Sequence, residues 1–282
     1  MSHTESAANE VSLKTVARLA DIVTKLHVFI YFCSEAPEEY EKVGLKGWSG
    51  YFASRTAAMG PLSTEMVIAT FYNFSPGRVS RAMEGVWDNV AAEDAQAARW
   101  TAAGRVLAKA APAISPEEIA EATESMQRAV DGFRWSGRPM AAGNYAVLDA
   151  CGDDPLVRLW QLATIVREWR GDTHIGLLIA EPLSGVECSV VSYARDQGKG
   201  IVKGSRSWPE EEWDGALASL KGRGLLASEE ALTDEGRTWR NDLEHRTNEL
   251  CAEIWANHDD AEVNRLGDLL QKLNDGLNQA RS

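Results

Sequence analysis

The sequence has few of the residues from which metal sites and disulfide frameworks are built. Its 282 residues include only four cysteines, and none of them forms a Cys-x-x-Cys pair. Its five histidines form no His-x-x-x-His pair. These absences exclude the common zinc motifs and covalent haem attachment, and they indicate the reduced thiols of a cytoplasmic protein. We therefore predict no metal ligands.

The motifs of the large nucleotide-binding and hydrolase families are missing as well. The chain contains no Gly-x-Gly-x-x-Gly, no phosphate loop and no Gly-x-Ser-x-Gly elbow. Those motifs mark dinucleotide sites, nucleoside triphosphate sites and α/β-hydrolase nucleophiles. Without them the sequence assigns neither a cofactor nor a reaction.

Positive charge is scarce, and no apolar run is long enough to cross a membrane. The chain has 29 Lys and Arg against 42 Asp and Glu, a net charge of −13 at pH 7. Extended contact with nucleic-acid phosphates needs a local basic patch, so DNA is not an expected partner. Residues 1–10 are polar rather than an apolar leader. We therefore expect a cytoplasmic protein that does not associate with membranes.

The most informative stretch that is present covers residues 155–181. It follows Asp154, a candidate N-cap, begins with Pro155 and is ended by Pro182. Its first half carries apolar side chains on nearly every side, which is typical of a helix that protein surrounds completely. The sequence therefore predicts a long buried central helix.

The second half of this segment contains the cluster Arg170, Asp172 and His174. Buried charges are costly unless they are paired. The cluster is therefore either an internal salt bridge with a hydrogen-bonded histidine, or the polar wall of a ligand cavity. Arg170 and His174 share a helix face, whereas Asp172 points elsewhere.

Two earlier segments supply further candidates for a ligand site. Residues 11–32 have a helical apolar period and place His27 and Tyr31 on one face, where they line a cavity or bond to each other. Residues 48–59 form a second predicted helix, which carries Phe52 and Arg55 among small residues. An arginine there needs a carboxylate or anionic partner, for which Asp172 is one candidate. Residues 35–41, around a proline, are predicted to form an acidic loop.

Three short matches in the same order suggest a tandem duplication. Pro-Leu-Ser occurs at 61–63 and again at 182–184, and Pro76 matches Pro209. Residues 101–105 match residues 233–237 in the pattern Thr-x-x-Gly-Arg. The duplication predicts that Thr101 and Thr233 both begin helices, after a turn-like segment at 91–98.

The second copy resembles the winged-helix domain of MarR-type regulators. The resemblance covers about sixty residues and rests on the residues before Thr233 and on its Leu-Thr-x-x-Gly helix start. The whole chain is also similar to an actinobacterial family of two-copy helix-turn-helix proteins, described as MarR-like or SalK-like, through YFASRTAAMG at 51–60 and REWRGDTHIG at 167–176. This resemblance implies a fold rather than DNA binding.

We expect a mainly α fold in which two winged-helix-like copies pack around the central helix, with a small β-hairpin as the wing. The predicted divisions are residues 1–111, 112–181 and 182–282.

The first hypothesis for the function is a protein that binds a small organic ligand, aromatic or anionic, between the copies, and enzymatic turnover there stays open. The alternatives are a MarR-like regulator that binds DNA through its first copy, and a structural or partner-binding protein. The candidate ligand-binding residues are His27, Tyr31, Phe52, Arg55, Arg170, Asp172 and His174.

Overall fold

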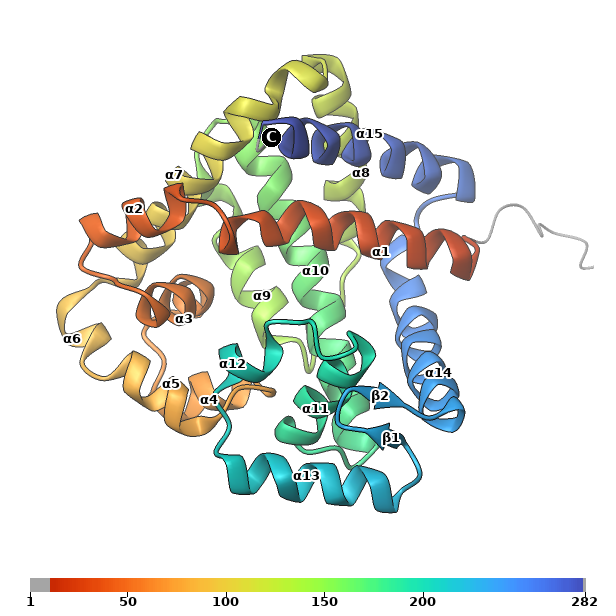
Figure 1. The fold of residues 1–282 in the computed structure, drawn as a ribbon. Coiled ribbons are helices and arrows are strands. Elements are labelled where there is room, and N and C mark those ends of the chain that lie inside the picture. Colours follow the sequence, from red (N-terminus) through yellow and green to blue (C-terminus); the bar gives the residue numbers. More distant parts are fainter. Residues whose placement is uncertain (1–10, 281–282) are drawn as a thin grey trace, which may run out of the picture.

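The computed structural model describes residues 11–280, and almost all of its regular structure is helical (Figure 1). The predicted mainly α class with one small hairpin is confirmed. The N-terminal part contains α1 (Leu13–Val28), α2 (Glu35–Lys42), α3 (Trp48–Thr56), α4 (Thr64–Thr70), α5 (Pro76–Met83), α6 (Val86–Asn89) and α7 (Ala92–Ala110). The middle contains α8 (Pro116–Asp131), α9 (Pro139–Ala146) and α10 (Pro155–Ala180). The C-terminal part contains α11 (Gly185–Arg195), α12 (Val202–Arg206), α13 (Glu210–Gly222), β1 (Leu226–Ser228), β2 (Ala231–Leu232), α14 (Asp234–Cys251) and α15 (Asp260–Gln279). Short 3₁₀ turns occupy Phe29–Tyr31, Ala57–Met59, Ala111–Ala113, Leu148–Cys151 and Ala252–Trp255.

Helix α10 is the predicted central helix. The Asp154 carboxylate caps it by accepting hydrogen bonds from the backbone N–H groups of Leu156 and Val157. The helix packs against α1, α7, α8, α9 and α14, and α1 crosses it in the middle of the molecule (Figure 1). From Leu156 to Trp169 its side chains are buried on all sides apart from Arg158 and Arg167, whereas most residues beyond Trp169 are only partly buried. The central helix is therefore enclosed only from Leu156 to Trp169.

The buried apolar residues form two separate cores. The larger core joins α1, α3, α7, α8, α10 and α15, so it contains residues from both ends of the chain. The smaller core lies under α11, α13 and the hairpin, and it includes Leu183, Val190, Trp213, Leu220 and Leu226. The part of the chain from 183 to 232 thus packs around apolar residues of its own.

The hairpin and the start of α14 form as the sequence predicts. Leu226 pairs with Leu232 in the antiparallel ladder, and the Thr233 hydroxyl caps α14 by accepting from the N–H of Gly236. A Cβ atom on Gly236 would lie 2.1 Å from the carbonyl oxygen of Leu225. Only glycine fits this position, which explains the glycine of the Leu-Thr-x-x-Gly pattern.

The proposed duplication matches the structure only in its first half. Ser63 caps α4 and Ser184 caps α11, each through its hydroxyl. The prediction for Thr101 is wrong, because α7 begins at Ala92 and the Thr101 hydroxyl donates to the Ala97 carbonyl inside that helix. The predicted turn at 91–98 is therefore also wrong. Between α5 and α7 the chain forms the short helix α6, whereas the hairpin occupies the corresponding place after α13.

The predicted loop at 35–41 is wrong too, because these residues form α2. Its proline lies in the first turn, where the missing N–H costs no helical hydrogen bond. Within residues 11–280 no single helix meets the length and apolarity needed to cross a membrane. Only α10 and α11 taken together do so, with a bend of 107° between them.

Candidate functional site

The structure distributes the seven candidate residues over three places. His27, Tyr31, Phe52 and Arg55 come together where α1, α3 and α10 meet. Arg170 and His174 face α14, and Asp172 faces α9. The sequence therefore identified residues from one shared site and from two separate helix contacts.

His27 is fully buried at the centre of a hydrogen-bond chain. The Thr164 hydroxyl donates to the Trp160 carbonyl, so it accepts from Nδ1–H of His27 at 3.0 Å. Nε2 of His27 is then the acceptor for the Tyr31 hydroxyl, at 2.6 Å. Burial lowers the pKa of His27 well below its usual value, and the nearby guanidinium groups lower it further. His27 is therefore a neutral imidazole at pH 7.

Arg55 pairs with a carboxylate that the sequence analysis missed. Its Nη2 lies 3.0 Å from Oε1 of Glu168, and its Nη1 donates to the Tyr51 hydroxyl at 2.8 Å. The expected partner, Asp172, is not in contact with it. The side chains of Arg55 and Glu168 are only 9% and 5% exposed, which makes this a buried ion pair. Burial by itself would raise the pKa of Glu168. The positive charges of Arg167 and Arg55 outweigh the effect of burial and keep this pKa below its usual value.

Three further arginines lie near this ion pair. Arg167 contacts Glu168 at 2.7 Å, and Arg99 donates to the Tyr31 hydroxyl at 3.3 Å. Arg206, from α12, stacks over the Phe74 ring at 4.0 Å. Burial lowers the pKa of Arg206, and the nearby charges of Arg55 and Arg167 lower it further. We call these four residues with Glu168 the arginine cluster: Arg55, Arg99, Arg167 and Arg206.

The arginine cluster carries more positive charge than its described partners balance. Glu168 is the carboxylate for both Arg55 and Arg167. Neither Arg99 nor Arg206 forms an ion pair within residues 11–280. In addition, Nε of Arg55 and Nε of Arg206 are buried without a hydrogen-bond partner among the described residues. Four guanidinium groups against one carboxylate leave an excess of three positive charges.

Aromatic rings surround these guanidinium groups. Arg55 lies 4.7 Å from the ring centroid of Phe71 and 5.4 Å from those of Tyr31 and Tyr51. Phe52 is fully buried and packs edge-on against Phe71 at 4.7 Å, which places it in the aromatic core behind the arginines. The site therefore combines fixed positive charge with flat apolar surfaces.

Arg170 and His174 connect α10 to α14. Nη2 of Arg170 donates to Glu244 at 2.8 Å and to Asn248 at 3.2 Å. The Thr247 hydroxyl donates to a backbone carbonyl and therefore accepts from Nδ1–H of His174 at 2.9 Å. Burial lowers the pKa of His174. Both side chains thus have protein partners at a helix contact.

Asp172 lies on the opposite side of α10, against α9. Its carboxylate accepts from the N–H of Ala141 in the first turn of α9, at 3.1 Å. Burial raises its pKa to about 7, and the charge of Glu168 adds to this effect. Asp172 is therefore partly protonated at neutral pH.

Arg99, Arg206 and Glu168 belong to the site but were not predicted from the sequence. Glu168 lies one turn before Asp172 in a helix already rich in charge, so nothing in the pattern singles it out. Arg99 lies in α7, directly after the segment 91–98 that was wrongly predicted to be a turn. Arg206 follows the glycine-rich stretch at 198–204, which is typical of a flexible loop. Within the described chain, no group of three or more His, Cys, Asp or Glu side chains is placed to hold a metal ion.

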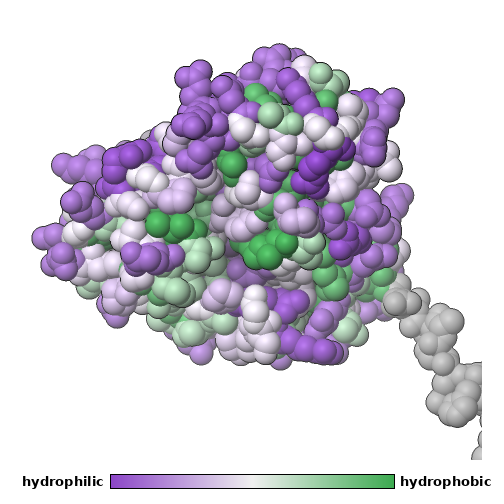
Figure 2. All heavy atoms as spheres, turned by 90° about the horizontal axis from the view of Figure 1, so that it is seen from below, coloured by the Kyte–Doolittle hydropathy of each residue, from purple (hydrophilic) through white to green (hydrophobic). Residues whose placement is uncertain are grey.

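The surface that a helix-turn-helix protein would present to DNA is acidic at α13. Glu210, Glu211, Glu212 and Asp214 are exposed in the first turns of this helix. Figure 2 views the molecule from the side of α13 and shows hydrophilic residues around the outline of this face, with smaller hydrophobic patches between them.

Three arginines of α5 and α7 could offer positive charge to DNA in the N-terminal half, but two of them already contact other residues of the chain. Arg105 pairs with Glu38 at 2.8 Å and with Glu39 at 2.6 Å. Arg78 donates to the Ser207 hydroxyl at 2.5 Å. Arg81 is exposed on α5 and forms no ion pair with the described residues.

Comparison with known proteins places the whole chain in one family. A family model described as a helix-turn-helix family matches residues 16–282, which is nearly the entire sequence. No curated protein and no solved structure matches the chain. The order α11, α13, hairpin and α14, over a small core of its own, agrees with that description. The chain belongs to this helix-turn-helix family.

Proposed function

We propose that this protein binds an anionic small molecule at the arginine cluster. The observation that carries the proposal is the charge excess in the arginine cluster, where Glu168 pairs with Arg55 and Arg167 and no carboxylate pairs with Arg99 or Arg206 among the described residues. Removing charge from water is costly unless an opposite charge compensates it. A bound carboxylate or similar anion would supply the missing acceptors for Arg99 and Arg206.

The neighbouring side chains favour an anion that carries an aromatic ring. Tyr31, Tyr51 and Phe71 present ring faces and edges next to Arg55. Planar guanidinium groups bind carboxylates in a bidentate manner and stack on rings, so an aryl carboxylate satisfies both features. The neutral pair of His27 and Tyr31 lies beside this position and is able to relay a proton, which keeps turnover open as a subsidiary possibility.

The competing function is transcriptional regulation through DNA. Membership of a helix-turn-helix family favours it, because the fold is one that commonly binds DNA. The carboxylates of α13 and the net charge of −13 argue against it, since phosphates would be repelled there. In our proposal the two-copy helix-turn-helix architecture serves as a scaffold for the ligand rather than as a reader of DNA.

The test is a binding titration with benzoate and with benzamide, its neutral analogue of similar shape. We expect benzoate to bind and to raise the melting temperature, and benzamide to do neither. Arg206→Ala removes one guanidinium that has no carboxylate partner among the described residues, so it should weaken benzoate binding about tenfold, as loss of a charged hydrogen bond does.

Arg134→Ala is the matched control, because Arg134 is 81% exposed and pairs with Glu253 away from the cluster. The proposal fails if no aryl carboxylate binds, or if Arg206→Ala and Arg134→Ala bind benzoate equally well.

A further inference from the structure

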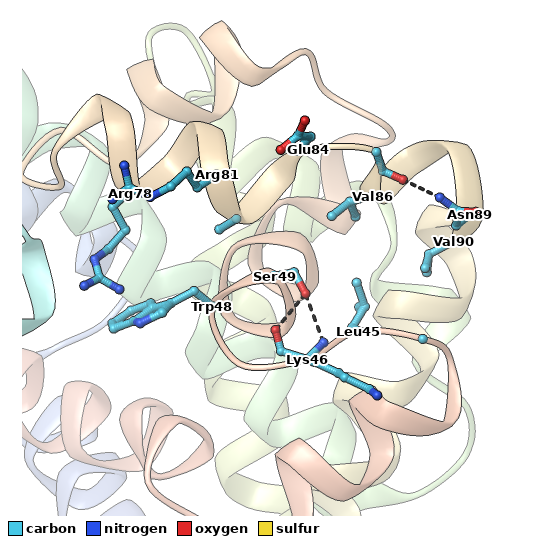
Figure 3. A pocket seen from close by; sticks show the side chains of 13 residues that line it. Leu45, Lys46, Trp48, Ser49, Arg78, Arg81, Glu84, Val86, Asn89 and Val90 are labelled. Carbon is cyan, nitrogen blue, oxygen red and sulfur yellow. Dashed lines mark hydrogen bonds between the residues drawn. The ribbon is translucent and has the colours of Figure 1, made fainter.

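A separate pocket opens on the surface between the α2–α3 loop and the helices α5 and α6 (Figure 3). Its volume is about 670 Å³. This volume lies within the range of sites that hold small organic molecules. Figure 3 shows Lys46 and Ser49 from the loop and α3 on one side, and Arg78, Arg81 and Glu84 on the other.

The pocket is basic although the protein is acidic. Lys46, Arg78 and Arg81 line it, and Glu84 is the only carboxylate among its lining residues, so the local balance is two positive charges. Lys46 and Arg81 are exposed and form no ion pair with any residue between 11 and 280. Each wall of the pocket therefore presents one cation without a carboxylate partner among the described residues.

Arg78 adds an unsatisfied donor to this wall. Its guanidinium stacks over the Trp48 ring at 4.5 Å, which fixes its position. One of its terminal nitrogens donates to Ser207, but its Nε is buried and has no hydrogen-bond partner among the described residues. A buried N–H of this kind is costly unless an acceptor binds to it.

The rest of the lining is apolar. Leu45, Val86 and Val90 cover the side of the pocket away from Arg78, and Ala82 also lines the pocket. Ser49 and Asn89 use their side chains in bonds to the backbone of Lys46 and of Gly85, so they contribute little to ligand charge. The pocket thus has two arginines at one end and apolar side chains at the other.

We infer that this pocket binds a small organic phosphate, with the phosphate beside Arg78 and Arg81 and the apolar part against Val86 and Val90. Lys46, on the opposite wall, points away from the two arginines in Figure 3 and turns its side chain towards the phosphate when the ligand binds. A phosphate monoester carries nearly two negative charges at pH 7, which matches the local excess of two positive charges. The residues that line this pocket include none of the arginine cluster, although Arg78 is close enough to Arg206 for the two charges to interact. The inference therefore stands on its own residues and does not depend on binding at the cluster.

The test is a titration of the full chain with phenyl phosphate, inorganic phosphate and uncharged benzyl alcohol. We expect phenyl phosphate to bind most tightly, inorganic phosphate more weakly, and benzyl alcohol not at all. The double variant Lys46→Ala/Arg81→Ala should bind phenyl phosphate at least about tenfold more weakly, because two charged donors are lost. Both side chains are exposed, so the fold should melt as the wild type does.

Lys14→Ala is the control, because it removes an exposed lysine of α1 that does not line the pocket. It should keep wild-type affinity for phenyl phosphate. The inference is overturned if phenyl phosphate does not bind, or if the double variant binds it as well as the wild type. It is also overturned if a short DNA duplex, rather than phenyl phosphate, binds the wild type and is lost in the double variant.

Discussion

At the scale of single residues, the main result is that buried charge is distributed unevenly. Arg170 has both a carboxylate and an amide oxygen on α14, whereas Arg99 and Arg206 have no carboxylate among the residues that the structure describes. Nε of Arg170 is buried without a hydrogen-bond partner among the described residues, but a terminal nitrogen of Arg170 has a carboxylate partner, which indicates a structural role. A buried arginine without a carboxylate partner indicates either a cost to stability or a missing ligand.

We predict that Arg170 is structural. Arg170→Leu should lower the free energy of unfolding by about 1 to 3 kcal/mol, because it removes a charged partner of the partly buried Glu244. The two side chains are 23% and 33% exposed, so the loss should stay below that of a fully buried pair. Urea unfolding measures it, and Arg170→Leu/Glu244→Leu should recover part of the loss. Benzoate binding should be unchanged in Arg170→Leu, and a large loss of binding would place Arg170 in the site.

Asp172 should make stability depend on pH. Its pKa is about 7 in the folded protein and near 3.9 in an unfolded chain, so the folded state holds the extra proton between these values. This group therefore favours folding at low pH, and its contribution is lost as pH rises through 7.

Asp172→Asn removes this effect while keeping an acceptor for the N–H of Ala141. We expect the variant to be more stable than the wild type by about 1 to 3 kcal/mol near pH 8, with a smaller gain near pH 5. Urea unfolding of both proteins at the two pH values measures the difference. An equal gain at both pH values, or a gain only at acidic pH, would contradict the raised pKa.

At the scale of elements, helix starts were the features most accessible to sequence analysis. Asp154 was predicted as a cap and Thr233 as a helix start, and both cap helices through their side chains. The two wrong predictions, a turn at 91–98 and a loop at 35–41, concern helices that begin without a side-chain cap or contain a proline. Helix α7 begins after Ala91, which makes no side-chain cap bond, and α2 carries a proline in its first turn.

The candidate site was predictable only in part, because its partners come from distant segments. His27 and Tyr31 are one turn apart, so their contact follows from helix geometry. The contact of Arg55 with Glu168 joins α3 to α10 across 113 positions, and local patterns carry no information about such pairs. For the same reason the sequence could not show that Asp172 faces away from Arg55.

The junction between the hairpin and α14 supports a prediction at this scale. Gly236→Ala should destabilise the protein by about 3 kcal/mol or more, because the added methyl group would overlap the Leu225 carbonyl and force the backbone apart. Gly215→Ala on α13 is the control. A Cβ atom there would meet no neighbouring group of the described chain within 4 Å, so alanine should raise helix stability by up to about 1 kcal/mol. Thermal unfolding compares them, and equal effects would show that the close contact at Gly236 is not real.

At the scale of the whole molecule, the helix-turn-helix fold and the charge distribution point in different directions. The family and the arrangement of α11, α13 and the hairpin suggest a DNA-binding scaffold. The acidic start of α13 and the net charge of −13 oppose phosphate contact. The unbalanced positive charge lies instead inside the molecule, at the arginine cluster, and in the pocket beside α5.

We therefore predict weak or absent binding to duplex DNA. Fluorescence anisotropy with random-sequence DNA and with DNA from the protein's own promoter, at about 50 to 200 mM salt, measures it. Submicromolar affinity with a steep salt dependence would contradict the prediction, since that slope reports neutralised phosphates.

The most direct measurement of the central claim is a crystal structure of the protein with 4-bromobenzoate, in which the bromine marks the ligand by anomalous scattering. The account predicts one bound molecule with its carboxylate in hydrogen-bond contact with Arg99 and Arg206, and its ring next to Tyr31 or Phe71. A ligand bound only elsewhere, with the guanidinium groups of the arginine cluster unchanged, would contradict it.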